Sequence, residues 1–292
     1  MGNKSRHNVL KSISAVGFTA GGIGTVKGSS AEENSSPDSD TNFSSNKKRD
    51  EMDGGEMRLN DENRISKEEW IQRKDDETSG VGVYASGDPG ENIDYHGAWE
   101  DESTLTASCW FSTWEIKTQT TYTVYKVIDE DGNIVTDGDG DYRFLVEMWA
   151  KHEVTDNGGT LCSGPSIGSA EQELKAVNDN TTFIDRDPKT KSRVNDERVT
   201  VSHSNSIQVG NVSIEYSRSS VVRFDDGRFG ADSWSPGKGD AEYVVEWETT
   251  SDTGDMDYVD VLGMVEISST TDGQFEDHVD SGLRWSWSLY SE

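Results

Sequence analysis

The chain has 292 residues, with 27 Lys and Arg against 56 Asp and Glu, so its formal net charge is -29. This charge disfavours nucleic-acid binding, because no basic patch is present to replace the counterions of a phosphate backbone. It also opposes compaction in dilute buffer, whereas molar salt shortens the screening length to about 3 Å and removes most of the repulsion.

The first 31 residues differ from the rest, because they contain basic residues and no Asp or Glu. A mildly apolar run at 12–26 follows the basic start, and small residues stand at 29–31. This layout predicts an export signal peptide at 1–31 that is removed from the mature protein. The apolar run is short and broken by glycines, so we expect no membrane span after signal removal.

Residues 5–11, SRHNVLK, resemble the twin-arginine export motif S-R-R-x-F-L-K. Arg6, Leu10 and Lys11 match the motif, and His7 stands where it has the second Arg. The resemblance implies export of an already folded protein, and therefore a secreted or cell-surface location. The excess of acid with little Lys resembles exported proteins of extreme halophiles of the haloarchaeal type. The mature domain itself resembles no family.

Residues 32–80 are rich in Ser, Asp, Asn, Glu and Lys and poor in apolar residues. A segment of this composition buries too little surface to offset its ordering entropy, which predicts a disordered acidic linker. One short helix is expected at 66–76, because Ser66 and Glu69 form a capping box ahead of a small apolar face.

From about residue 81, aromatic and β-branched residues alternate with polar ones between Gly, Asp, Asn and Ser turns. This pattern predicts an all-β domain over 81–292, an antiparallel β-sandwich or a barrel-like fold with one short helix. A tight turn or bulge is expected at 210–211, a hairpin loop at 129–133 and helical structure at 169–177. Strands are expected at 104–111, 121–128, 142–150, 198–204, 212–217, 243–247, 259–267 and 283–289.

The chain has two cysteines, Cys109 and Cys162. In an exported protein we expect them to form a disulfide, which would stabilise the fold by about 3–4 kcal/mol on the chain-entropy model. Two separate buried thiols are the alternative.

A single motif suggests catalysis: GPSIG at 164–168 matches G-x-S-x-G, with Ser166 as the nucleophile and His203 or His278 downstream as the base. The motif requires a strand-to-helix turn in a parallel sheet, and the sequence predicts no such sheet. We therefore expect no catalytic residue, and a secreted hydrolase remains the alternative function.

Acidic residues cluster at 129–141, where Asp129, Asp131, Asp137, Asp139 and Asp141 are weak candidates for a cation site. Neither EF-hand register places Gly and Glu where a calcium loop needs them. The sequence has no HExxH and no C-x-x-C. We expect neither a metal nor a cofactor.

Nine tryptophans are many for this length, and most are expected to fill the core. Trp234 lies in a Gly- and Ser-rich stretch at 229–240 and is expected to be exposed, while Trp110 and Trp114 share one strand face and would form an aromatic platform. The sequence thus predicts a secreted, non-catalytic interaction protein whose ligand is unknown: a glycan, a surface protein or a competing cell. An envelope-associated structural protein is a second alternative.

Overall fold

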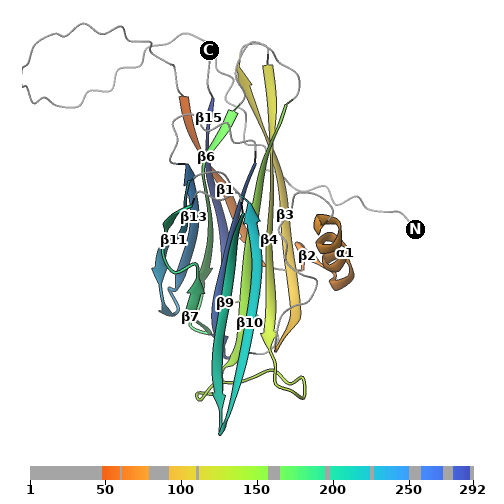
Figure 1. Cartoon of the computed structure of the whole chain (residues 1–292), viewed down its shortest axis with the longest axis vertical. Helices are drawn as coiled ribbons and strands as arrows, with labels where there is room; N and C mark the ends of the chain where they lie inside the picture. The colour runs from red at the N-terminus through yellow and green to blue at the C-terminus, as the bar shows by residue number, and fades with distance from the viewer. Residues whose placement is uncertain are drawn as a thin grey trace, which may run out of the picture. The chain divides into compact units, whose positions relative to one another are not determined.

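The computed structural model describes residues 48–59, 61–78, 92–109, 112–156, 165–194, 198–223, 227–249, 258–271 and 279–289. The chain divides into two compact units, Met1–Ser44 and Ser45–Glu292, and every described residue belongs to the second. These residues form antiparallel sheets with one helix (Figure 1), which confirms the all-β prediction.

The larger sheet has seven strands in the order β12-β7-β14-β5-β4-β3-β2. Every pairing within it is antiparallel, and β5 and β14 form its centre. The strands are β2 (Arg64–Ile65), β3 (Ile93–Cys109), β4 (Ser112–Val127), β5 (Tyr142–Asp156), β7 (Thr181–Asp187), β12 (Gly237–Lys238) and β14 (Tyr258–Ser269).

The second sheet has six antiparallel strands in the order β1-β15-β6-β13-β11-β8. Its members are β1 (Lys48–Arg58), β6 (Pro165–Ala176), β8 (Ser192–Val194), β11 (Gly227–Ser235), β13 (Glu242–Thr249) and β15 (Val279–Leu289).

The hydrophobic core lies between these two sheets. Strand alternation turns Phe144, Val146 and Met148 of β5 inward, and all three are fully buried. The two sheets pack tightly at Gly263 of β14, because a Cβ at this position would lie 2.8 Å from Cε1 of Tyr243 in β13. Any larger residue at position 263 would push the sheets apart.

A third layer covers the outer face of the seven-stranded sheet, the face that points away from the core. It is the hairpin of β9 (Arg198–Val209) and β10 (Val212–Arg223), which forms a two-stranded sheet of its own. Figure 1 shows the hairpin in front of the sandwich, with its turn at the lowest point of the view. The predicted break at 210–211 is this turn, in which Gly210 has a φ of 62° that favours glycine.

The prediction of a disordered linker over 32–80 is wrong for residues 48–59 and 61–78, which contain strands and a helix. β1 pairs with β15, and α1 (Lys67–Thr78) covers the region where a helix was expected at 66–76. Leu59, Ile65 and Trp70 are buried in the hydrophobic core. A segment of polar average composition thus contributes to the domain through three well-placed apolar side chains.

The helical structure expected at 169–177 is also wrong, because this segment belongs to β6. Its residues favour helix by propensity, but β6 lies between β15 and β13 and hydrogen-bonds to both. Gln172 and Leu174 are fully buried there. Pairing on both sides overrides the local preference.

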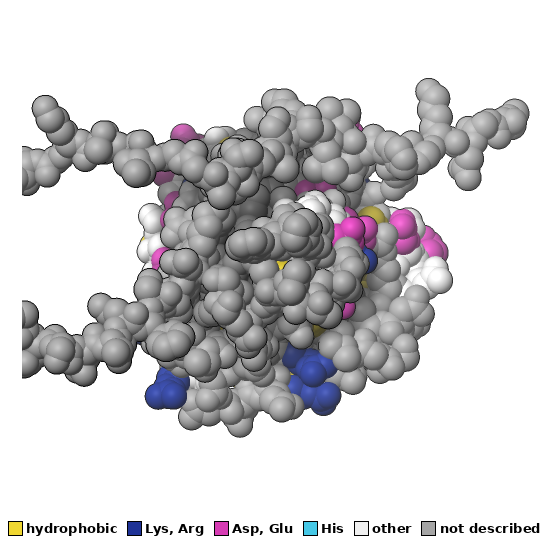
Figure 2. Space-filling model, turned by 90° about the horizontal axis from the view of Figure 1, so that it is seen from above, with side chains coloured by type: hydrophobic (Ala, Val, Ile, Leu, Met, Phe, Trp, Pro, Cys, Tyr) yellow, Lys and Arg dark blue, Asp and Glu magenta, His cyan; other side chains and the backbone are white. Residues whose placement is uncertain are grey.

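Only some side chains at the upper end of the molecule belong to the described residues. Seen from above, the described side chains that reach the surface are mostly acidic, basic or otherwise polar, with few hydrophobic ones (Figure 2). This agrees with the charge excess of the sequence.

Candidate functional site beneath the hairpin

The hairpin β9–β10 has two chemically different faces, because successive side chains alternate along each strand. The outer row carries mainly hydroxyls and is largely exposed: Thr200, Ser202, Ser204, Ser206, Gln208, Ser213, Glu215, Ser217, Ser219 and Val221. The inner row faces the sheet and mixes apolar with ionisable side chains: Val199, Val201, His203, Asn205, Ile207, Val209, Val212, Ile214, Tyr216, Arg218, Ser220 and Val222.

The first ionisable contact of the inner row joins Arg218 to Glu147 of β5. Nε of Arg218 donates to Oε2 of Glu147 over 2.6 Å, and the Ser220 hydroxyl donates to the same oxygen over 3.2 Å. The Arg218 guanidinium also lies 5.0 Å from the ring centroid of Tyr125. Arg218 is 2% exposed and Glu147 1%, so this ion pair is sealed between hairpin and sheet.

The second contact is centred on His203. Its Nδ1 lies 2.9 Å from Oδ2 of Asp187, the last residue of β7, and its Nε2 lies 3.6 Å from Oε2 of Glu266 in β14. Asn205 of the hairpin donates to Oε2 of Glu266 over 2.6 Å, and Arg143 of β5 donates to Oε1 over 2.8 Å. Three strands of the sheet therefore hold the hairpin through charge.

Electrostatics match this geometry. Burial opposes protonation of His203, but the carboxylates of Glu266 and Asp187 outweigh it and raise the pKa of His203 above 6.5. Burial also disfavours the Glu266 carboxylate, yet hydrogen bonds from His203 and Asn205 and the charge of Arg143 lower its pKa below 4.5. The contacts therefore favour the ionised form of both His203 and Glu266 in the docked state.

His152 of β5 provides a contrast. It is fully buried on the core side, where its Nδ1 lies 3.0 Å from the Thr118 hydroxyl. Burial lowers the pKa of His152 to about 3, so this ring is neutral. The pKa values of these two buried histidines thus shift in opposite directions, and only the contacts under the hairpin favour the imidazolium.

A buried ion pair holds two layers together only while both of its charged partners are present. Apolar residues of similar volume usually hold two layers together as strongly as a buried ion pair or more strongly. The reason is that each charge of the ion pair loses its hydration on burial. Such a pair depends on both partners, and removing one leaves a buried charge that costs about 3–5 kcal/mol. The hairpin is thus held in two ways: by ion pairs that a change of charge or a competing ion can break, and by the buried side chains of Val201, Ile207, Tyr216 and Val222, which belong to the hydrophobic core cluster.

The turn end of the hairpin leaves apolar side chains in solvent. Val209 is 39% exposed and Val212 63%, which places them among the few large exposed hydrophobic residues of the described chain. They belong to the inner row, so the apolar face of the hairpin continues beyond the sheet that it covers.

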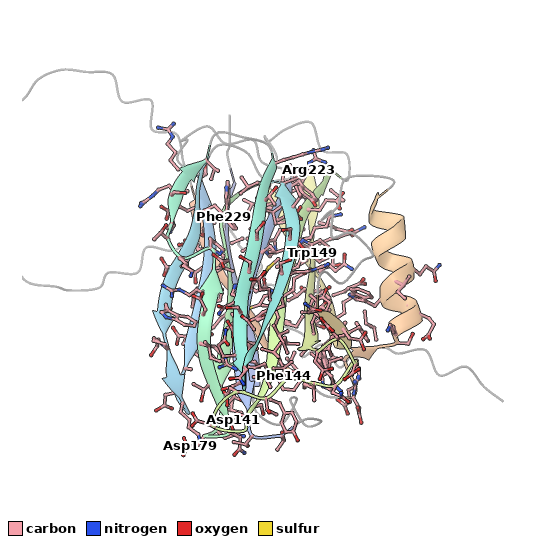
Figure 3. The ribbon with its side chains drawn as sticks, turned by 60° about the horizontal axis from the view of Figure 1, so that its bottom comes forward. Asp141, Phe144, Trp149, Asp179, Arg223 and Phe229 are labelled. Atoms are coloured by element: carbon pink, nitrogen blue, oxygen red, sulfur yellow. The ribbon has the colours of Figure 1, made fainter. Side chains whose placement is uncertain are left out.

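At its base, the hairpin is attached by the backbone N–H of Arg223, which donates to Oδ2 of Asp260 over 3.3 Å. Figure 3 shows Arg223 at this upper end and Phe144 at the opposite end of the sheet. Tyr258 donates to the other oxygen of Asp260 over 2.6 Å. This end therefore also meets the sheet through a carboxylate.

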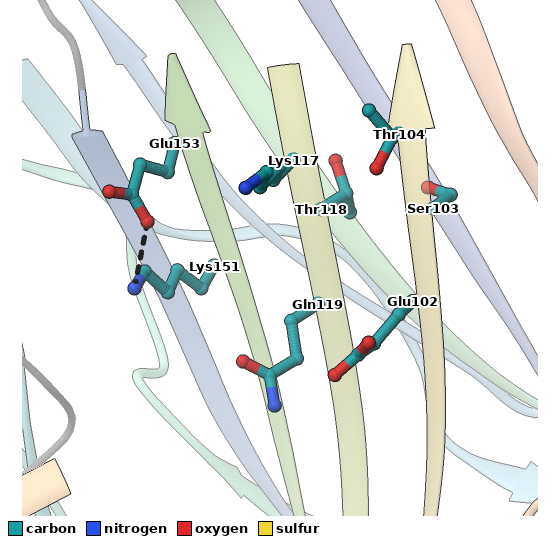
Figure 4. A pocket seen from close by; sticks show the side chains of 8 residues that line it. All are labelled: Glu102, Ser103, Thr104, Lys117, Thr118, Gln119, Lys151 and Glu153. Atoms are coloured by element: carbon teal, nitrogen blue, oxygen red, sulfur yellow. Dashed lines mark ion pairs between the residues drawn. The ribbon is translucent and has the colours of Figure 1, made fainter. Parts of the chain in front are cut away.

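A shallow groove of ≈ 160 Å³ lies on β3, β4 and β5 (Figure 4). Lys151 and Glu153 pair across 3.1 Å in it. Its remaining side chains are Glu102, Ser103, Thr104, Lys117, Thr118 and Gln119. The groove combines both signs of charge on strand surfaces, which is the arrangement of a solvated sheet face.

The predicted catalytic candidates are not assembled as an elbow requires. Ser166 lies in the antiparallel strand β6, paired with Ser288, rather than at a strand-to-helix turn. His203 belongs to the hairpin, where its partners are Asp187 and Glu266. His278 lies outside the described residues.

The predicted aromatic sites need correction. Trp114 is 2% exposed because it shares the core-facing side of β4 with Ile116, so it is not part of an exposed platform. Trp234 lies in β11 and is half-buried, with the Arg186 guanidinium 4.4 Å from its ring centroid and Phe183 stacked at 6.1 Å. Trp110 lies outside the described residues.

The acidic stretch at 129–141 forms turns. Oδ1 of Asp129 accepts from the N–H groups of Asp131 and Asn133, and Oδ1 of Asp137 accepts from those of Asp139 and Asp141. Within the part of the chain that the structure describes, no group of three or more His, Cys, Asp or Glu is placed to hold a metal ion.

Two further expectations concern residues beyond this description. The export motif of Arg6, His7, Leu10 and Lys11 lies outside the described residues, as does Cys162, while Cys109 ends β3. The disulfide and the signal peptide therefore stay predictions. No helix in the described ranges is long and apolar enough to cross a membrane.

Comparisons with known proteins add little to this site. No family model and no curated protein matches the sequence. A solved structure described as a "Pore forming protein" is similar with a TM-score of 0.34 and 11% identity, over 63% of this chain and 78% of that one. A likeness at this level does not place the chain in a family.

Proposed function

We propose that the chain is an exported, non-catalytic protein that acts by releasing the β9–β10 hairpin onto a lipid membrane. The observation that carries the proposal is the attachment of the hairpin. It shares no strand pairing with either sheet, and ionisable side chains hold its centre to the sandwich. Such a layer can leave with the strand pairing of both sheets intact, and its release exposes the buried apolar side chains of its inner row, Val201, Ile207, Tyr216 and Val222.

The alternation of the hairpin suits the membrane interface. If the released hairpin lies flat on a membrane, the inner row meets the lipid and the hydroxyl-rich outer row faces water. A two-stranded hairpin pairs only the inner edge of each strand, so the N–H and C=O groups of its two outer edges must stay at the hydrated interface and only the inner-row side chains enter the lipid. Val209 and Val212 are exposed before release, so their burial in lipid is a net gain of up to about 1.5–3 kcal/mol each.

Export and salt adaptation belong to the same proposal. The basic, acid-free start of the sequence supports export, and the net charge of -29 supports work at high salt. A membrane target outside the producing cell fits both features.

Vesicle flotation in 2 M KCl tests the proposal. The protein should float with vesicles, and Val209→Ser/Val212→Ser should reduce flotation strongly, because both side chains are exposed and their loss leaves the fold intact. Val177→Ser is the matched control, since Val177 is 48% exposed and directly follows β6 of the six-stranded sheet rather than belonging to the hairpin. Failure of the unmodified protein to float, or full flotation of the double variant, would reject the function.

A further inference from the structure

The inner row of the hairpin places two cations side by side. Arg218 and His203 occupy directly opposed positions of β10 and β9. Side chains in such positions have Cβ atoms about 4.5–5.5 Å apart, and like charges there repel each other. The hairpin therefore tolerates this pair only where anions neutralise it.

In the docked state the sandwich supplies these anions. Glu147 faces Arg218 from β5, while Asp187 from β7 and Glu266 from β14 face His203. Other charged and titratable groups around the cluster include Asp185, Arg143, Tyr216 and Tyr125. All of the carboxylates belong to strands of the sheet, so a hairpin that leaves the sheet leaves its counter-charges behind.

We propose that Arg218 and His203 of the released hairpin together bind the phosphate of an anionic lipid headgroup. This inference rests on the proposed function and names the ligand class of the same site. A guanidinium binds phosphate through paired N–H donors, and an imidazolium adds a further charged donor. The phosphate thus replaces the carboxylate of Glu147 and those around His203.

The position of the pair fits a headgroup rather than the acyl chains. Ile207, Val209, Val212, Ile214 and Tyr216 lie between the pair and the turn, and Val199, Val201 and Val222 lie beyond it. These apolar side chains face the same way, and they place the two cations at the surface of the lipid. Long charged side chains keep their heads at headgroup level while their stems cover apolar surface.

The test compares vesicles of phosphatidylcholine with vesicles of phosphatidylglycerol in 2 M KCl. At this ionic strength the screening length is about 3 Å or less, so the net charge of -29 no longer repels an anionic surface. A preference between the two lipids then reports short-range contacts. The unmodified protein should bind phosphatidylglycerol about tenfold more tightly or better, as expected for charged hydrogen bonds.

The decisive variant is Glu147→Gln/Arg218→Gln, which neutralises the buried ion pair on both sides. It should still bind phosphatidylcholine vesicles but lose the preference for phosphatidylglycerol. His203→Gln is an independent second variant and should lose part of the preference. Arg198→Gln is the control, because Arg198 is an exposed cation at the start of the same hairpin, on the same face of β9 as Thr200 of the outer row, and this variant should keep the preference.

The outcomes separate the two proposals. Binding of the unmodified protein to both lipids with equal affinity would overturn the phosphate site while leaving membrane binding in place. Retention of the full preference by the double variant would do the same. Absence of binding to either vesicle would overturn both.

Discussion

Removal of the Glu147 carboxylate is the sharpest perturbation of the hairpin. In Glu147→Ala, the guanidinium of Arg218 stays in a site where it is 2% exposed and loses the oxygen that Nε reaches over 2.6 Å. Breaking a buried pair in this way costs about 3–5 kcal/mol. We expect this cost to destabilise the docked hairpin relative to the released one, which raises the population of the released state by about a hundred- to five-thousand-fold.

Hydrogen–deuterium exchange followed by mass spectrometry measures this population. Amides of β9 and β10 should exchange much faster in Glu147→Ala, because an isolated two-stranded hairpin is marginally stable in water. Amides of β5 and β14 that pair with other strands should change little. Glu153→Ala is the matched control: it removes the same side chain from the same strand, but its partner Lys151 is at the surface, and such pairs contribute about 0–1 kcal/mol.

Two results would refute the reasoning. Unchanged exchange in β9 and β10 would mean that the ion pair does not hold the hairpin. Equal acceleration in every strand of both sheets would mean that the hairpin opens only when the whole domain unfolds. Replacing both partners, as in Glu147→Leu/Arg218→Leu, should restore slow exchange, since apolar pairs of this kind are neutral or stabilising.

Three further predictions concern pH, salt and the cysteines. The stabilisation of the docked hairpin by His203 is complete below pH 6.5 and is lost as the pH rises through the raised pKa of His203. The stabilisation by Glu266 is complete above pH 4.5 and is lost as the pH falls through the lowered pKa of Glu266. Exchange of the hairpin amides should therefore be slowest between about pH 4.5 and 6.5 after correction for intrinsic rates, and a constant protection factor up to pH 9 would contradict the charged contact. The thermal midpoint should rise steeply between about 0.2 and 2 M KCl as repulsion is screened, and a flat profile would count against salt adaptation. Thiol labelling of the denatured, unreduced protein should find Cys109 and Cys162 blocked, and two labelled thiols would exclude the disulfide.

Much of the fold follows from local patterns in the sequence. The alternation over 142–150 and 259–267 predicts the central strands β5 and β14, and the structure confirms both. Where the local sequence pattern predicted the wrong secondary structure, contacts with other strands of the fold decided the outcome. Residues 169–177 favour helix by composition, yet strands on both sides hold them in β6.

The candidate site was largely beyond sequence reasoning. Arg143, Asp187, His203 and Glu266 come from four strands that are distant along the chain, and only the packing of the hairpin on the sheet brings them together. One feature of the sequence did point to the site. His203 alternates with Val199 and Val201 on one face of a predicted strand, and an ionisable side chain on an apolar face requires a buried partner of opposite charge.

Site-specific fluorescence along the hairpin tests the central claim most directly. In a Cys109→Ser/Cys162→Ser background, single cysteines at Gln208, Val209, Val212 and Ser213 carry an environment-sensitive dye, and spectra are recorded in 2 M KCl with and without phosphatidylglycerol vesicles. Dyes at Val209 and Val212, in the inner row, should shift to the blue with vesicles, while dyes at Gln208 and Ser213, in the outer row, should keep the spectrum of water. Spectra that vesicles leave unchanged at all four positions, or that shift equally in both rows, would contradict the release of an amphipathic hairpin onto the membrane.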